Sequence, residues 1–171
     1  MAGGWIARRL AAMMVAGLVC GSILASAANA QGPDDLARLG DEVGRLYGEG
    51  RYAEAIPIAE RVLALAIKRH GQEHAEVASA MALVALVYWA QGRYLEAEPL
   101  FKSNLAFLEK ALGRDHPNVA TSLNNLAELY RAQGRYSEAE FLHKRGLAIR
   151  EKALGPDHPD VGTSLNNLAE L

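Results

Sequence analysis

The segment Thr121–Glu140, TSLNNLAELYRAQGRYSEAE, contains the pattern from which the fold is predicted. Its opening segment, TSLNNLAEL at Thr121–Leu129, returns unchanged at Thr163–Leu171. Towards the N-terminus, the Gly-Arg-Tyr triplet that begins at Gly134 recurs at Gly92 and at Gly50, with the same spacing in the numbering. Self-similarity at a fixed period of this length indicates an array of repeated supersecondary units that stack on one another.

Each unit contains two apolar stripes with the period of an α-helix. In the third repeat the first stripe comprises Val119, Leu123, Leu126, Ala127 and Tyr130. Their offsets of 0, 4, 7, 8 and 11 place them on one face of a helix. The second stripe follows the Gly-Arg pair, runs towards Leu154, and comprises Tyr136, Ala139, Leu142, Gly146 and Leu147. The pattern therefore predicts a helix-turn-helix hairpin in every unit.

Glycine, histidine and proline mark the predicted ends of these helices. Gly134 and Gly155 stand where a helix ends in a left-handed residue. The Asp-His-Pro triplets that begin at Asp115 and Asp157 supply an N-cap acceptor and a proline that the first helical turn tolerates. Two further prolines fall near the first turn of predicted second helices, where a missing N–H costs least: Pro57 and Pro99.

Neither helix of a hairpin can bury its stripe alone, so neighbouring hairpins must share a core. The predicted fold is all-α, a right-handed α-solenoid of stacked antiparallel helix-turn-helix hairpins with a concave and a convex face. The repeats are placed at about 34–71, 72–113 and 114–155, with a truncated fourth at 156–171. Together with the N-terminal segment they make a repeat array spanning 31–171.

The residues Leu126-Ala127, Tyr130, Gly134, Tyr136 and Glu138-Ala139 form a pattern that resembles the tetratricopeptide repeat. The 42-residue form, with LGxDHPxVA and LNNLA, resembles the kinesin light chain subclass that is common in bacterial arrays. The resemblance covers roughly 34–171. Armadillo and HEAT repeats also include a 42-residue period, but they do not carry this Gly-x-Tyr-x-Glu-Ala turn.

The resemblance implies a non-catalytic scaffold that holds a peptide or partner-protein segment in a concave groove lined by the first helix of each hairpin. The groove positions are those beside the Leu-Ala pair: Tyr47, Leu83, Leu86, Trp89, Asn124, Asn125, Glu128, Arg131, Asn166 and Asn167, with Asp41, Gly44 and Glu170 among them. Relatives that clamp a C-terminal carboxylate carry basic residues early in the first helix. This chain has Ala37, Ser79 and Thr121 there, which disfavours such a ligand.

The first helix of the second repeat, Val77–Ala90, is apolar nearly all round. One interpretation is an apolar binding patch of Leu83, Leu86 and Trp89, because tryptophan at the centre of a contact surface often carries much of the binding energy. The alternative is a helix that is simply more buried, packed by the N-terminal segment or by a second copy. The stretch is too short to span a bilayer, which takes about 20 apolar residues.

Residues 1–30 have the profile of a signal peptide. They contain no Asp, Glu or Lys, and Arg8-Arg9 precede an apolar run from Leu10 to Leu24. Small residues at Ala28 and Ala30 predict cleavage after Ala30, with Ala27 as the alternative site, and therefore a periplasmic or secreted chain. A twin-arginine signal and an uncleaved anchor are alternatives, although the apolar run is short for a spanning helix.

The charge balance argues against nucleic acid as a partner. Loss of Arg8 and Arg9 lowers the basic count from 18 to 16 against 20 acidic residues, a net charge of −4 with no long basic run. The signal peptide also contains the one cysteine, so the remaining chain folds without a disulfide framework. The expected partner is a protein or peptide, and contact with the membrane is expected only through the signal peptide before cleavage.

Catalytic, cofactor and metal motifs are absent from the sequence, and none of these sites is expected. His70 and His74 are four apart in the numbering and could share a helix face, but no HExxH motif occurs and the histidines of the Asp-His-Pro triplets belong to the capping element. No GxSxG motif is present. Recurrent carboxylates at the starts of the second helices are structural: Glu54, Glu96 and Glu138.

The fourth repeat stops at Leu171, the equivalent of Leu129, before its second helix. Leu165, Leu168 and Leu171 would then lack their usual cover, and solenoids normally end in a polar cap. Two alternatives to the scaffold function follow. The chain is a fragment that forms the regulatory array of a longer protein, such as a caspase-like protease, or it self-associates through its terminal helix.

Overall fold

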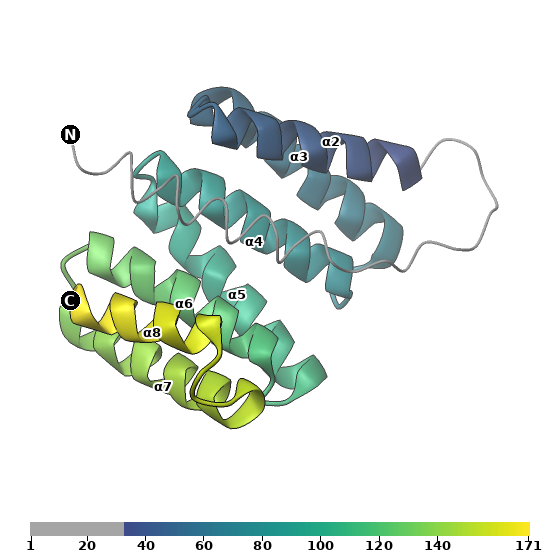
Figure 1. Cartoon of the computed structure of the whole chain (residues 1–171). Coiled ribbons are helices and arrows are strands. Elements are labelled where there is room, and N and C mark those ends of the chain that lie inside the picture. The colour runs from purple at the N-terminus through teal and green to yellow at the C-terminus, as the bar shows by residue number, and fades with distance from the viewer. Residues whose placement is uncertain (1–32) are drawn as a thin grey trace. The chain divides into compact units, whose positions relative to one another are not determined.

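The computed structural model describes residues 33–171 as seven α-helices, and the side chains from Asp35 onwards (Figure 1). The contacts between Cα atoms divide the chain into two compact units, with the boundary between Gly92 and Arg93. The predicted signal peptide, residues 1–30, lies outside the described residues. Within the described part of the chain no helix combines the length and the apolar character that crossing a membrane requires.

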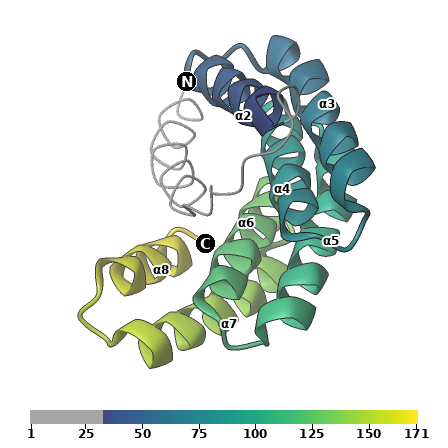
Figure 2. The same cartoon turned by 90° about the vertical axis from the view of Figure 1, so that its right-hand side faces the viewer.

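The first unit contains three helices that pack in chain order: α2 (Pro33–Gly48), α3 (Tyr52–His70) and α4 (Ala75–Ala90). Figure 2 shows α2 and α4 as the neighbours of α3. Their shared core consists of Leu39, Val62, Ala66, Val77 and Ala80. These residues recur at helical spacing on the facing sides of the three helices, so the apolar stripes read from the sequence are the packed faces.

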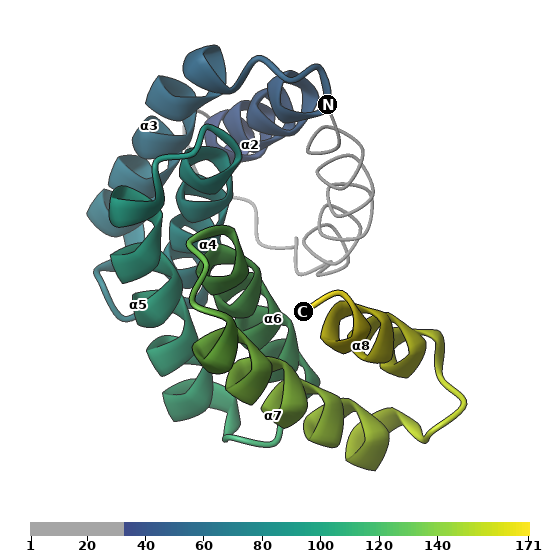
Figure 3. The ribbon, with the colours of Figure 1, turned by 90° about the vertical axis from the view of Figure 1, so that its left-hand side faces the viewer.

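The second unit contains four helices: α5 (Tyr94–Leu112), α6 (Pro117–Ala132), α7 (Tyr136–Leu154) and α8 (Pro159–Ala169). They also pack in chain order, and Figure 3 shows α7 beside α6. Val119, Ala120, Leu123 and Ile149 form the buried core. A Cβ added at Gly146 of α7 would lie 3.4 Å from the carbonyl oxygen of Ala120, so the glycine permits the close approach of α7 to α6.

The helix ends follow the sequence pattern, and the structure identifies the capping atoms. Gly134 and Gly155 have φ of 76° and 85°, the left-handed region that was predicted for them. Each Asp-His-Pro triplet caps its helix through histidine. Nδ1 of His116 accepts a hydrogen bond from the backbone N–H of Asn118 at 3.1 Å, and His158 does the same for Asp160 at 3.2 Å.

Two local expectations are wrong. Tyr136 was placed on the buried stripe of the second helix, but its side chain is 56% exposed, because α7 begins at this residue and the packed stripe starts one turn later at Ala139. Pro57 and Pro99 occupy the sixth position of α3 and α5, in the second turn rather than near the first. Both helices continue through them, and both prolines are exposed, so the unmade hydrogen bond lies at the solvent side.

Candidate partner-binding site

The face of α6 that the sequence assigns to the groove carries polar side chains in buried positions. Asn124 and Asn125 are each 8% exposed, and Glu128 is 4% exposed. Burial of amides and carboxylates is unfavourable unless they find hydrogen-bond partners. The hydrogen-bond partners of these three side chains therefore determine which donors and acceptors remain available to a binding partner.

Glu128 contacts an arginine and a histidine of its own unit. Its Oε2 accepts hydrogen bonds from Nη2 of Arg131 at 2.7 Å and from Nε at 3.1 Å. Its Oε1 lies 3.3 Å from Nε2 of His143, a residue of α7 that is 2% exposed. Burial acts to raise the pKa of the Glu128 carboxyl, but the interactions with His143 and Arg131 outweigh it, so the pKa lies below the ordinary value of 4.5.

The predicted asparagines are only partly satisfied within the unit. Nδ2 of Asn167, on α8, donates to Oδ1 of Asn124 at 2.6 Å, so the structure brings two predicted groove residues from successive first helices together. Oδ1 of Asn125 is buried and has no hydrogen-bond partner among the described residues. Asn166 is exposed. Asn125 is therefore the acceptor on this face that an incoming donor would satisfy.

In the first unit the predicted apolar positions are largely enclosed. Leu83 is partly buried and packs against the core of α2, α3 and α4. Leu86 is 7% exposed. Trp89 is half-buried, and its Nε1 is buried without a hydrogen-bond partner among the described residues. Tyr47 is buried with its ring edge-on to Tyr52, at 5.2 Å between centroids. The binding role of these residues stays a prediction.

The recurrent carboxylates at the starts of the second helices pair with the arginine of the Gly-Arg-Tyr triplet. Arg51 bonds to Glu54 at 2.6 Å, and Arg93 bonds to Glu96 at 2.9 Å. In the third repeat, Nε of Arg135 bonds to Glu138 at 2.6 Å. The triplet thus supplies a turn and a side chain that ties the turn to the next helix.

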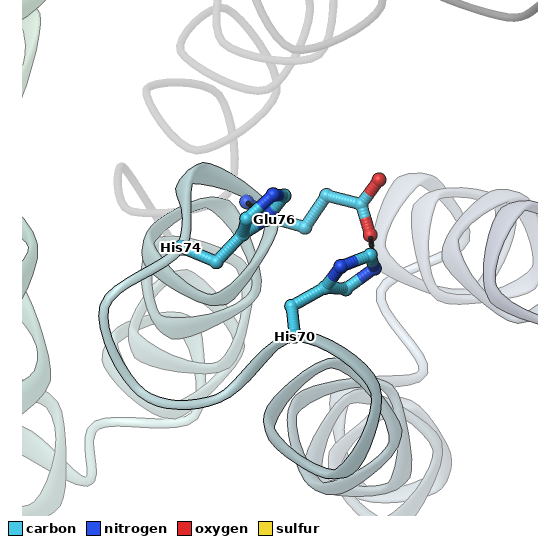
Figure 4. Close-up of side chains that lie close together, drawn as sticks. All are labelled: His70, His74 and Glu76. Carbon is cyan, nitrogen blue, oxygen red and sulfur yellow. Dashed lines mark hydrogen bonds and ion pairs between the residues drawn. The ribbon is translucent and has the colours of Figure 1, made fainter.

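One cluster of metal-ligating side chains lies in the described part of the chain, at the turn between α3 and α4 (Figure 4). His70 and His74 do not share a helix face as the sequence suggested, because α3 ends at His70 and His74 is the N-cap of α4. Their rings stack across the turn with 4.2 Å between centroids. Glu76 joins them, with Oε2 at 2.6 Å from Nε2 of His70.

Sequence reasoning missed two of these residues, His143 and Glu76. His143 occupies the position that Phe101 holds one repeat earlier, and Glu76 the position that Asn118 holds one repeat later. Each is thus a departure from the repeat, which is the signal that could have found it. His143 was hidden because its contact with Glu128 joins two different helices.

A sequence model of the tetratricopeptide repeat matches residues 43–103 and 77–152. A Podosopora anserina protein of kinesin light chain type, with nearly identical TPR-like repeats, is 30% identical; the match covers 82% of this chain and 67% of that one, with a TM-score of 0.75. A single-substitution variant of the same protein gives 30% identity, coverage of 83% and 67%, and a TM-score of 0.74.

A third solved structure, BtubC (BKLC) from P. vanneervenii, matches at 22% identity over 96% of this chain and 64% of that chain, with a TM-score of 0.72. At this identity the likeness concerns the fold. The chain spans about two thirds of the length of each of these structures. No curated protein matches the chain. The likenesses confirm the predicted fold class, an all-α TPR-like solenoid.

Proposed function

Because the chain belongs to the tetratricopeptide repeat family, whose members are generally non-catalytic modules for protein–protein interaction, we propose that it binds an extended peptide or partner-protein segment along the polar face of α6. The partner is recognised chiefly through its backbone. The side chains that receive it are Asn125, Asn124 and Asn167, flanked by the Glu128–Arg131 pair.

The observation that carries the proposal is the unsatisfied acceptor Oδ1 of Asn125. A buried polar atom without a hydrogen bond costs about 1–3 kcal/mol, and an incoming N–H removes that cost. Asn125 is 8% exposed, and binding requires its buried Oδ1 to become accessible to the partner. An extended segment presents backbone N–H groups at regular intervals, and an amide side chain can bond both its N–H and its C=O groups.

The neighbouring charges add a constraint on the partner. Glu128 is buried and already neutralised by Arg131, whose side chain is 23% exposed. A partner carboxylate that approached this face would compete with Glu128 for Arg131, and a partner cation would compete with Arg131 for Glu128. The surface therefore favours a segment whose central residues are uncharged.

A random-sequence peptide library displayed on phage and selected against the full chain tests the proposal. Enriched peptides are then titrated by fluorescence anisotropy against the wild-type chain, the Asn125→Ala variant and a matched Lys144→Ala control on the exposed side of α7. We expect Asn125→Ala to weaken binding about tenfold, the equivalent of one hydrogen bond, and Lys144→Ala to leave it unchanged. No enriched peptide, or equal affinity for the Asn125→Ala variant, contradicts the proposal.

We further propose that residues 1–30 direct export to the periplasm or the medium and are removed after Ala30. The support is the sequence pattern of Arg8-Arg9, the apolar run Leu10–Leu24 and the small residues before Gln31. Mass spectrometry of the chain recovered from the envelope and medium of a bacterial host should show an N-terminus at Gln31. A chain that keeps Met1 in the membrane fraction would instead establish an uncleaved anchor.

Self-association through α8 is a second candidate, because Leu165 on this helix is 50% exposed. Sedimentation equilibrium of the wild type and of a Leu165→Ser variant tests it. A dimer that dissociates on this substitution supports self-association through α8, and a wild-type monomer at all concentrations excludes it.

A further inference from the structure

We propose that the turn between α3 and α4 is a binding site for a divalent transition metal, with Zn²⁺ as the fitting ion and His70, His74 and Glu76 as its protein ligands. Each residue offers one ligand atom, and the three atoms lie within 4.8 Å of one another. Figure 4 shows the three side chains gathered on one side of the turn. Two imidazoles and one carboxylate are a donor set that zinc sites use, with an open fourth position for water.

The distances permit coordination after side-chain movements of up to about 1.5 Å, because the ligand atoms lie within 4.8 Å of one another. Zinc bonds to nitrogen and carboxylate oxygen are about 2.0–2.2 Å, which places the ligand atoms of a tetrahedral site about 3.3 Å apart. Oε2 of Glu76 lies 2.6 Å from Nε2 of His70, so this pair must open by about 0.7 Å. The Glu76 side chain is 55% exposed and can make that movement without disturbing the core.

The Nε2 atom of His70 is buried and makes no hydrogen bond among the described residues, and its one close polar neighbour is Oε2 of Glu76 at 2.6 Å. A buried nitrogen in this condition is unfavourable unless it is bound. Coordination would satisfy it. The last turn of α3 adds a favourable field, since the C-terminal end of a helix carries partial negative charge, whereas exposed Lys68 and Arg69 oppose it weakly.

The repeat distinguishes the two histidine ligands, because His74 recurs in the later repeats and His70 does not. His74 recurs as His116 and His158, all three of which cap the following helix, so this position serves the fold. His70 does not recur, because its equivalents are Leu112 and Leu154. Both leucines are partly exposed, at 43% and 36%, so the fold does not require histidine there.

Metal binding has a consequence for the helix cap. Nδ1 of His74 accepts the backbone N–H of Glu76 at 3.2 Å in the metal-free turn. A metal at Nδ1 would use the same lone pair, and a metal at Nε2 requires the tautomer whose Nδ1 carries hydrogen. Either arrangement breaks the hydrogen bond from the Glu76 amide to His74. The metal would then link α3 to α4 through its ligands.

The full chain, purified without a histidine tag, is titrated with Zn²⁺ by calorimetry and with Co²⁺ by visible spectroscopy. We expect one ion per chain. His70→Leu installs the residue of the other repeats, and His74→Asn keeps an N-cap acceptor while removing the imidazole. Both should weaken Zn²⁺ binding at least tenfold without changing the thermal midpoint of the metal-free chain. His116→Asn is the matched control at the equivalent cap and should bind as wild type.

The amide of Glu76 gives an independent measurement. Its hydrogen-exchange rate and its chemical shift should change on addition of Zn²⁺ in the wild type and in His116→Asn, but not in His70→Leu. Absence of binding by the wild type at micromolar Zn²⁺ would overturn the proposal. So would unchanged binding in His70→Leu and His74→Asn, or loss of binding in His116→Asn.

Discussion

The buried pair of Glu128 and His143 can be replaced by the residues that stand at the same positions one repeat earlier, Leu86 and Phe101. The three variants Glu128→Leu, His143→Phe and the double variant form a double-mutant cycle. The structure predicts that each single change destabilises the second unit and that the two changes together largely cancel, because each single change leaves a buried polar side chain without one of its contacts.

The magnitudes follow from the contacts. Glu128→Leu removes the carboxylate that contacts both Arg131 and His143. The side chain of His143 is 1% exposed, and removal of one partner of such a buried pair costs about 3 kcal/mol. His143→Phe leaves Glu128 with both hydrogen bonds from Arg131, so we expect about 1 kcal/mol. The double variant should lose about 1 kcal/mol, because Arg131 can turn to solvent and an apolar pair replaces the buried polar pair. The coupling energy is then about 3 kcal/mol.

Urea denaturation followed by circular dichroism gives the change in the free energy of unfolding. Because repeat arrays can unfold in parts, hydrogen exchange of the α6 amides supplies the local value. Additive effects of the two substitutions, or a Glu128→Leu variant as stable as wild type, would show that the contact between α6 and α7 is energetically neutral.

Three further predictions concern the same unit. Leu123 is completely buried, so Leu123→Ala should lower the free energy of unfolding by about 3–4 kcal/mol in urea titrations, while the exposed Leu165→Ala changes it little. Gly134 has φ of 76°, so Gly134→Ala should cost about 1–2 kcal/mol, whereas Gly162→Ala, inside α8 with open space around it, should gain about 0.5–1 kcal/mol in the same assay. The lowered pKa of Glu128 stabilises the folded state above about pH 4.5, and this contribution should disappear as the pH falls below it, with a shallower loss in Glu128→Gln.

Most of the fold could be predicted because its determinants are local and repeat. The stripe from Val119 to Tyr130 has the spacing of one helix face, and every member of it is buried. The left-handed glycine at Gly134 and the capping triplet before α6 also act within a short stretch of sequence. Three copies of the same local pattern remove the ambiguity that a single copy would leave.

The candidate site was harder to predict because its contacts join different helices. The burial of Glu128 depends on His143, which lies beyond the Gly-Arg-Tyr turn, on the next helix. The spacing of His70 and His74 suggested one helix face, but the left-handed Gly71, with φ of 76°, ends α3 between them. Helical periodicity gives the direction of a side chain on its own helix and not the identity of the side chain that it meets.

Departures from the repeat separate positions that serve the fold from positions that serve this chain alone. A residue that the fold requires should recur, as the capping histidines do at His74, His116 and His158. His70 and Glu76 differ from the residues at the equivalent positions of the next repeat, Leu112 and Asn118, and they contact each other at one turn. His143 also differs from its equivalent, Phe101, and it contacts Glu128, which recurs as Glu170. The metal-site proposal uses this argument at His70, whose equivalents are leucines. The partner-binding proposal rests on a different observation, the unsatisfied Oδ1 of Asn125, because Asn125 recurs as Asn167 and its position in the repeat does not single it out.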